Sequence, residues 1–566
     1  MKVKIAALQL EALELTQGRE ALERALAMID RAAALYQPDL MITPECTYPA
    51  YVLGSVKEFN ANYPGDPLPA FAEKARQHKI HLCLGLATPA ETADGPVIYN
   101  EAVLIGPDGA IIGRTAKSLL WHFDSRWFCA GTSYPVFETA IGRIGMLVCA
   151  DGRMPEIARS LAQAGAQLIL DPTCWVTYAA SRQNLPNPQA DYMLATRAFE
   201  NGVWCVATDK VGLERGTVLY VGRSCIISPT GRKVMEGPSD REEIVFAEVE
   251  LAPRAIPAAP RRPELYERLL TPTEQLPVHA LLQEPLVPHR AHFRGGVAQY
   301  KMFTSTQAMG ETVRPLLAQF GREGVDLAVL PDVPPALAEE AAHRGDLVFP
   351  FYRSLSKQSG VALLATAVES EGGRRYKTAR LFWQGEELGK WQQTHFTAQD
   401  EGGWTAGAEI GPVVKLPGES GARIGVMLGA DGYGPEVARC LMLAGADVIL
   451  WPTRATVPGA DEAAGFGLVA IARSRAAENR VHVLCATPLE PASGLQSGEH
   501  GCAIIVDANG TVVAPALTDT AMGVSAQLSV AASREKLRAP GTDVVYNRKP
   551  ENYQGLVVSK QSAINS

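Results

Sequence analysis

The sequence has no hydrophobic run long enough to cross a membrane and no long run of lysine and arginine. A membrane-spanning helix needs about 20 apolar residues in a row, and no stretch of the chain approaches that length. Nucleic-acid-binding proteins usually carry clustered basic charge, whereas this chain has a formal net charge of −8 and a pI of about 5.8. The composition therefore predicts a protein that binds neither membranes nor nucleic acid.

The first residues printed do not have the uninterrupted apolar core expected of a signal peptide, and the sequence has no CxxC motif. The segment KVKIAALQL (2–10) alternates as a strand does, and Glu11 and Glu14 follow before any long apolar core. We therefore expect a cytoplasmic protein, in which disulfides are rare. None of the ten cysteines lies in a CxxC pair, so we expect no zinc or redox site, and neither a metal nor a cofactor. Most of these cysteines are expected to be small buried apolar side chains.

The sequence does contain a long internal repeat. MLVCADGRMPEIAR (146–159) is echoed by VMLGADGYGPEVAR (426–439), with Cys149 opposite Gly429. Further matching segments follow in the same order: PDLMITPE (38–45) with VDLAVLPD (325–332), AGAQLILDPT (164–173) with AGADVILWPT (444–453), and RRPELYERL (261–269) with RKPENYQGL (548–556). A repeat of this length indicates duplication of a whole domain rather than a solenoid.

The domain boundaries follow from the extent of the repeat. The first copy reaches residue 275, and a proline-containing stretch with little periodicity comes after it. We predict a first domain over 1–275, a linker over 276–295 and a second domain over 296–566.

Within each copy, short apolar runs alternate with amphipathic stretches. DLMIT, HLCLGLA and QLILD predict strands. Residues 18–36 place leucine and alanine at helical spacing with charged residues between them. Residues 155–166 begin with Pro-Glu and end near a glycine, as helices commonly do. The pattern predicts a layered α/β fold for each copy.

Three reactive residues in the first copy lie at the ends of expected strands: Glu45, Lys117 and Cys149. Backbone N–H groups at a helix start lower a thiol's pKa and can receive an oxyanion. A glutamate can take the thiol proton and later activate water, and a lysine can stabilise a tetrahedral intermediate. Taken one by one, these residues also allow a structural interpretation: a carboxylate cap, a solvated lysine and a buried cysteine.

The segments around these residues resemble the nitrilase superfamily, the carbon–nitrogen hydrolases with a Glu–Lys–Cys triad. The matching segments are PECTYPAY (44–51), GRTAK (113–117) and GRIGMLVCADGRMPEIARSLAQAGAQLILDPT (142–173). The resemblance covers the first copy and, more weakly, the second. It implies an α-β-β-α sandwich for each copy. It also implies that Glu45 is the general base, Lys117 the transition-state stabiliser and Cys149 the nucleophile that forms a thioester.

Further residues have counterparts in the same family. Asp124 stands where its hydrolases often carry a second glutamate, which leaves an auxiliary catalytic role and a structural role in its loop both open. The order Cys-x-Asp-x-Arg-x-Pro-Glu resembles amidases, ω-amidases and N-carbamoyl-amino-acid hydrolases, and in that pattern Arg153 binds a substrate carboxylate. The alternative for Arg153 is an internal ion pair with Asp151 or Glu156. Trp175 is expected to line either the substrate pocket or the core.

This resemblance favours hydrolysis of a small amide or N-carbamoyl compound, with release of ammonia or carbamate-derived products. The alternatives are a nitrilase, an acyltransferase that passes the thioester to an amine, and a non-catalytic binding or regulatory protein. The expected partner is a small-molecule substrate.

The second copy lacks the three reactive residues. Asp332, Gln393 and Gly429 stand opposite the glutamate, the lysine and the cysteine, and a glycine cannot form a thioester. We therefore predict a catalytically degenerate domain. Nitrilase-like domains usually pair through a helical face, so the resemblance implies that the two copies form an internal pseudo-dimer; further homo-oligomerisation stays open.

Overall fold

The computed structural model divides the chain into two compact units. Unit 1 contains Met1–Pro257, Ala463–Phe466 and Leu537–Asp543; unit 2 contains Ala258–Glu462, Gly467–Lys536 and Val544–Ser566. The structure describes residues 1–177, 185–252, 259–286, 291–303, 305–333, 344–398, 400, 403–491, 499–517 and 519–557. No helix in these ranges combines the length and the apolar character of a membrane span.

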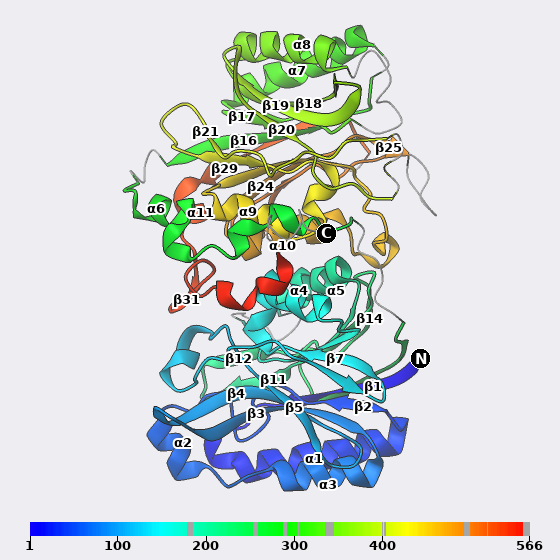
Figure 1. Ribbon diagram of the computed structural model, residues 1–566, viewed down its shortest axis with the longest axis vertical. Coiled ribbons are helices and arrows are strands. Elements are labelled where there is room, and N and C mark those ends of the chain that lie inside the picture. The colour runs from blue at the N-terminus through cyan, green and yellow to red at the C-terminus, as the bar shows by residue number, and fades with distance from the viewer. Residues whose placement is uncertain are drawn as a thin grey trace. The chain divides into compact units, whose positions relative to one another are not determined.

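Unit 1 has two sheets between two helical layers (Figure 1). In the first sheet β15 (Glu243–Glu250) pairs with β1, and the order is β5 (Ile111–Ala116), β4 (Gly95–Ile105), β3 (His81–Thr92), β2 (Leu40–Ile42), β1 (Lys2–Glu11), β11 (Lys210–Glu214), β12 (Val218–Val221), β9 (Val176–Thr177). The second sheet has the order β14 (Lys233–Glu236), β13 (Cys225–Ile227), β10 (Trp204–Thr208), β8 (Leu168–Pro172), β7 (Gly142–Met146), β6 (Val136–Thr139).

The helices of unit 1 cover the outer faces of these sheets. Helices α1 (Gly18–Tyr36) and α3 (Leu68–His78) lie on the first sheet, and α4 (Pro155–Gln163) and α5 (Leu194–Asn201) on the second (Figure 1). A shorter helix, α2 (Val56–Asn62), precedes α3. The buried residues of α1 recur at helical spacing and form one apolar stripe, which explains why this segment is a helix and which face it packs: Ala21, Ala25, Met28, Ile29 and Ala32.

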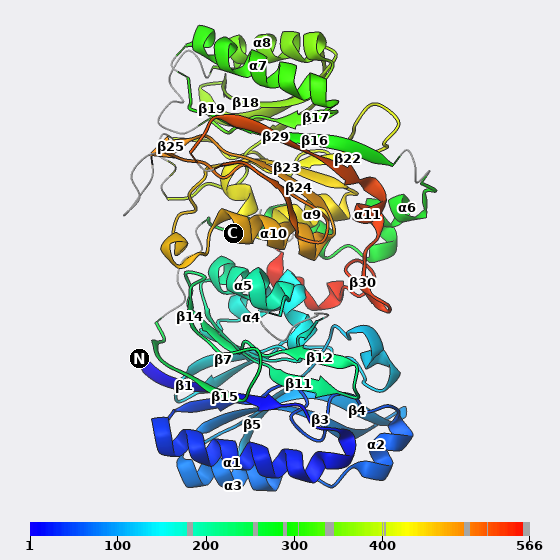
Figure 2. The ribbon, with the colours of Figure 1, turned by 180° about the vertical axis from the view of Figure 1, so that it is seen from behind.

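Unit 2 repeats this architecture, as Figure 2 shows from the other side. One sheet has the order β20 (Glu386–Gln392), β19 (Arg374–Trp383), β18 (Ala362–Glu371), β17 (Leu327–Val329), β16 (His292–Gln299), β29 (Met522–Ser529). The other has the order β21 (Val414–Lys415), β22 (Arg423–Val426), β23 (Val448–Pro452), β24 (His482–Ala486), β27 (Ile504–Val506), β28 (Val512–Pro515). The outer helices are α7 (Thr306–Glu323), α8 (Gly345–Ser359), α9 (Glu436–Leu443) and α10 (Leu468–Asn479).

The predicted α/β class and the four-layer sandwich are thus confirmed for both copies. The stretch predicted as a linker contains helix α6 (Pro277–Gln283), and β16 begins at His292, slightly before the predicted domain start.

In unit 1 the candidate site lies at the carboxyl ends of the parallel strands at the centre of each sheet. Strand β2 is parallel to β1 and β3, and β8 is parallel to β7 and β10. The carboxyl ends of parallel strands meet at one edge of a sheet, where polar residues can gather without interrupting the core. Glu45 follows β2, Cys149 follows β7, and the Glu45 N–H donates to the Thr173 carbonyl beyond β8 at 3.3 Å. The two sheets therefore bring their polar strand ends together.

Candidate active site

A buried lysine joins two carboxylates in unit 1. Lys117 Nζ lies 2.7 Å from Glu45 Oε1 and 2.7 Å from Asp124 Oδ2, and all three side chains are fully buried. Lys117 follows β5, and Asp124 lies in a short 3₁₀ turn, η2 (His122–Arg126). An ammonium group has three N–H donors, and the two carboxylates account for two of them. Among the described residues, no further side chain or carbonyl accepts a hydrogen bond from this ammonium.

The charges of this cluster are set by burial and by their closeness to one another. Burial lowers the pKa of Lys117, but Asp124 and Glu45 outweigh it, so that this pKa lies well above its ordinary value. Burial also raises the pKa of Asp124, an effect that Lys117 opposes. Lys117 is therefore a stable cation.

Cys149 begins the 3₁₀ turn η3 (Cys149–Arg153) with a left-handed backbone, φ +52°. Its N–H donates to Asp171 Oδ1 at 2.7 Å, and its Sγ lies 3.6 Å from the Cys174 carbonyl oxygen. Burial raises the pKa of Cys149 well above its ordinary value, and the charge of Glu45 raises it further. The expectation that a helix start lowers this pKa is wrong, because α4 begins only at Pro155 and burial dominates.

Two further residues of this cluster were missed by sequence reasoning. Asn100 donates from Nδ2 to Glu45 Oε1 at 2.5 Å, and Lys117 Nζ lies 5.5 Å from the centre of the Tyr51 ring. The Tyr51 hydroxyl is buried and has no hydrogen-bond partner among the described residues. Tyr51 is part of the segment PECTYPAY, but its side-chain position depends on tertiary packing. Asn100 lies within β4, where no local pattern distinguishes it.

A separate network holds the turn that carries Glu45. Cys46 has a left-handed backbone, φ +43°, and its carbonyl accepts a hydrogen bond from the buried Lys210 Nζ at 2.9 Å. The Cys174 thiol donates to the Glu45 carbonyl at 3.3 Å. These contacts explain why Cys46 and Cys174 lie beside the site: they position the turn.

Arg153 is buried and stacks on an aromatic ring. Its guanidinium lies 4.4 Å from the centre of the Trp121 ring, and its Nε has no hydrogen-bond partner in the part of the chain that the structure describes. Burial lowers the pKa of Arg153 to about 9, which leaves it charged at neutral pH. Asp151 does not pair with it but accepts the Leu119 N–H at 2.7 Å and the Ser118 N–H at 3.0 Å.

Glu156, the other residue of that alternative, is buried as well. Trp175 is fully buried directly after Cys174, and its backbone N–H donates to Asp209 Oδ1 at 2.9 Å.

The residues of unit 2 that stand opposite Glu45, Lys117 and Cys149 form a different arrangement. Asp332 Oδ2 lies 3.2 Å from the buried Lys377 Nζ, a lysine supplied by β19 rather than by the segment after β20. Gln393 instead donates from Nε2 to the His395 carbonyl at 2.6 Å. Gly429 keeps the left-handed backbone, φ +48°, and a Cβ added there would lie 2.9 Å from Gln393 Oε1. The turn persists with a glycine at the position of Cys149.

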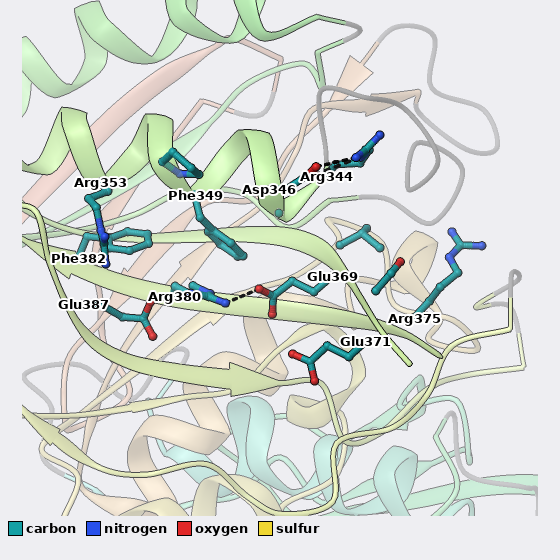
Figure 3. A pocket seen from close by; sticks show the side chains of 14 residues that line it. Arg344, Asp346, Phe349, Arg353, Glu369, Glu371, Arg375, Arg380, Phe382 and Glu387 are labelled. Carbon is teal, nitrogen blue, oxygen red and sulfur yellow. Dashed lines mark hydrogen bonds and ion pairs between the residues drawn. The ribbon is translucent and has the colours of Figure 1, made fainter. Parts of the chain in front are cut away.

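Unit 2 also has a hollow of about 810 Å³ between α8 and strands β18–β20 (Figure 3). None of the three counterpart residues lines it. Several of its charges pair with one another, as in the ion pairs of Arg380 with Glu369 and of Arg344 with Asp346. This internal pairing gives no indication of a reaction. Among the described residues of the whole chain, no group of three or more His, Cys, Asp or Glu side chains could hold a metal ion.

A model of the carbon–nitrogen hydrolase family matches residues 4–254 and, a second time, residues 296–536. The chain therefore belongs to this family and carries two tandem copies of its domain. It is an enzyme of the class that acts on carbon–nitrogen bonds other than peptide bonds.

Individual relatives fall in the nitrilase and amidase branches. The chain is 29% identical over 245 residues to a probable nitrilase of Schizosaccharomyces pombe, covering 41% of this chain and 86% of that protein. It is 27% identical over 232 residues to the human omega-amidase NIT2, covering 39% and 80%. Among solved structures, an amidase from Nesterenkonia sp. is 24% identical, with a TM-score of 0.37 and coverage of 44% of this chain and 90% of that one.

Proposed function

We propose that the first copy hydrolyses the C–N bond of a small amide or N-carbamoyl compound through a thioester on Cys149. The observation that most strongly supports this is the buried Lys117 ammonium, held by Glu45 and Asp124 at 2.7 Å each. A buried cation with one N–H that meets no acceptor among the described residues is suited to stabilise an oxyanion in a site that excludes water.

In the first half of the reaction, the Cys149 sulfur attacks the carbonyl carbon while Glu45 takes the thiol proton. A base is required because the raised pKa of Cys149 keeps the thiol protonated at neutral pH. Lys117 stabilises the oxyanion of the tetrahedral intermediate. The C–N bond then breaks, Glu45 returns the proton to the leaving nitrogen, and ammonia departs, leaving a thioester.

In the second half, water attacks the thioester carbon and Glu45 takes a proton from that water. The second tetrahedral intermediate collapses with cleavage of the C–S bond. The proton returns to Cys149, and the acid product is released. Asn100, which donates to Glu45, holds the carboxylate in one orientation through both halves.

A substrate carboxylate would explain the buried Arg153. Its guanidinium lies four positions after the nucleophile, and no carboxylate of the described chain neutralises it. A guanidinium binds a carboxylate through two parallel hydrogen bonds, which compensates for the cost of burying the charge. We propose an acidic small molecule, with Trp121 and Trp175 as aromatic walls.

For the second copy, we propose a degenerate domain without its own turnover, because Gly429 cannot form a thioester. Product analysis tests the whole proposal. The full chain is incubated with matched amides, N-carbamoyl amino acids and nitriles, with and without a carboxylate, and ammonia and acid are measured. Turnover of acidic amides or N-carbamoyl compounds supports it. Turnover of nitriles alone would make the enzyme a nitrilase, and conjugates in place of free acid would make it an acyltransferase.

A further inference from the structure

The two copies allow a comparison of buried polar groups within one chain. Some are kept and make the same contacts in both copies. Asp151 and Asp431 each accept the N–H of the residue just before their turn. Arg197 and Arg475 each donate from Nε to a carbonyl of that turn at 3.0 Å. Because the second copy has lost the triad but kept these groups, they maintain the fold rather than the chemistry.

Asp171, in contrast, is a buried polar group that the second copy has lost together with the triad. It lies in β8, is fully buried, and accepts the Cys149 N–H on Oδ1 at 2.7 Å. Its Oδ2 has no hydrogen-bond partner among the described residues. The residue opposite is Trp451, which reverses the interaction: its indole N–H donates to the Gly429 carbonyl at 2.9 Å.

Backbone strain explains this pattern. Cys149 has φ +52°, a conformation that is unfavourable for a residue with a side chain, whereas Gly429 has φ +48° without that cost. A nucleophile that must keep its Sγ at the site in a strained conformation needs an anchor. A glycine needs none, and a tryptophan can occupy the space of the carboxyl group.

We propose that Asp171 is a positioning residue, which fixes the strained Cys149 backbone through the Cys149 N–H and so aims Sγ at the bound carbonyl. The inference rests on the proposed nucleophilic role of Cys149. Because the Cys149 N–H donates to Asp171, it is not available to the oxyanion. Other donors, chiefly Lys117, must then stabilise the oxyanion.

Two substitutions separate hydrogen bonding from space filling. Asp171→Asn keeps an acceptor for the N–H, and Asp171→Val keeps the approximate volume without an acceptor. Asparagine matches the shape of the carboxyl group and keeps an oxygen that can accept the Cys149 N–H. Asp431→Asn is the matched control, a buried carboxylate at the equivalent turn of the second copy.

The measurement is the rate of Cys149 alkylation by iodoacetamide in the full chain, followed by mass analysis of the peptide that carries Cys149. We expect Asp171→Val to slow alkylation about 10- to 100-fold, the loss typical of a reacting atom misplaced by about 1 Å. Asp171→Asn should stay within about threefold of wild type, and the control should not change the rate. Thermal unfolding of each variant shows whether it is folded. If Asp171→Val does not fold, Asp171→Thr takes its place as a variant whose hydroxyl is a weaker acceptor.

Where an amide substrate has been found, Asp171→Val should lower kcat far more than it changes KM. A wild-type alkylation rate in folded Asp171→Val would overturn the proposal, as would equal slowing in Asp171→Asn. Because alkylation needs no substrate, a failure to find amide turnover would count against the proposed function without altering this result.

Discussion

At the scale of single residues, the site depends on balanced buried charge. Lys117 is the one cation that touches Glu45 and Asp124 in the described part of unit 1, and its charge persists because both carboxylates raise its pKa against the effect of burial. Removing either carboxylate changes the charge of the cluster and the protonation of Lys117 together.

Replacing Asp124 by asparagine should therefore lower the pKa of Lys117. The lysine would lose its proton at a lower pH, so the alkaline limb of the pH profile of kcat should move to lower pH. The loss of one charge-assisted hydrogen bond, worth about 1.5–3 kcal/mol, should lower kcat/KM about 10- to 100-fold. Asp346→Asn, which removes an ion-paired carboxylate outside the site, is the control. An unchanged alkaline limb would argue that Asp124 only ties down its loop.

Arg153→Met should raise KM for an acidic amide about 10- to 100-fold, because one bidentate charge-assisted contact is lost. The matched neutral amide should be almost unaffected, and Arg153→Lys should be intermediate, since lysine cannot form the planar pair. The comparison is made in steady-state kinetics with both substrates. Equal effects on the acidic and the neutral amide would contradict a carboxylate-binding role.

At the scale of elements, Asp151 joins the two segments that carry Lys117 and Cys149, the proposed transition-state stabiliser and nucleophile. It accepts N–H groups from Ser118 and Leu119, next to Lys117, and from Val148, next to Cys149. It thereby fixes the distance between the segment after β5 and the turn after β7. The same bonds recur around Asp431, so this link belongs to the fold of both copies.

Burial raises the pKa of Asp151 from its ordinary 3.8 to about 6. Between these values the folded protein keeps a proton that the unfolded chain has released, so the free energy of unfolding should decrease as pH rises from about 4 to 6. The contribution of this one group is about 3 kcal/mol at most. Urea unfolding of wild type and Asp151→Asn across this range should show a shallower pH dependence in the variant. Identical slopes would contradict the assignment.

The sequence predicted the strands and helices well, because strand ends and the long repeat are local signals. Glu45 and Lys117 do lie together, and the four-layer sandwich is present in both copies. Asn100, Tyr51 and Asp171 could not be found in this way, since each lies in a segment whose local pattern is that of an ordinary core. The prediction that the pKa of Cys149 is lowered was wrong for the same reason, because burial is a property of tertiary packing.

At the scale of the whole molecule, unit 1 is not a single continuous stretch. It includes Ala463–Phe466 and Leu537–Asp543, which lie far along the chain from its other residues. We therefore expect residues 1–275 expressed alone to unfold at lower temperature and to lose activity. Co-expression with residues 276–566 should restore both if the second copy acts as a scaffold. A stable, fully active monomer of 1–275 would contradict a scaffold role.

The most direct test of a single working site per chain is the acyl-enzyme itself. The full chain is mixed with an acidic amide, quenched in acid during turnover, and examined by intact mass and peptide mapping. We predict one acyl group per 566-residue chain, on the peptide that carries Cys149, and none in Cys149→Ala. An acyl group on a residue of the second copy, or one that persists in Cys149→Ala, would contradict it.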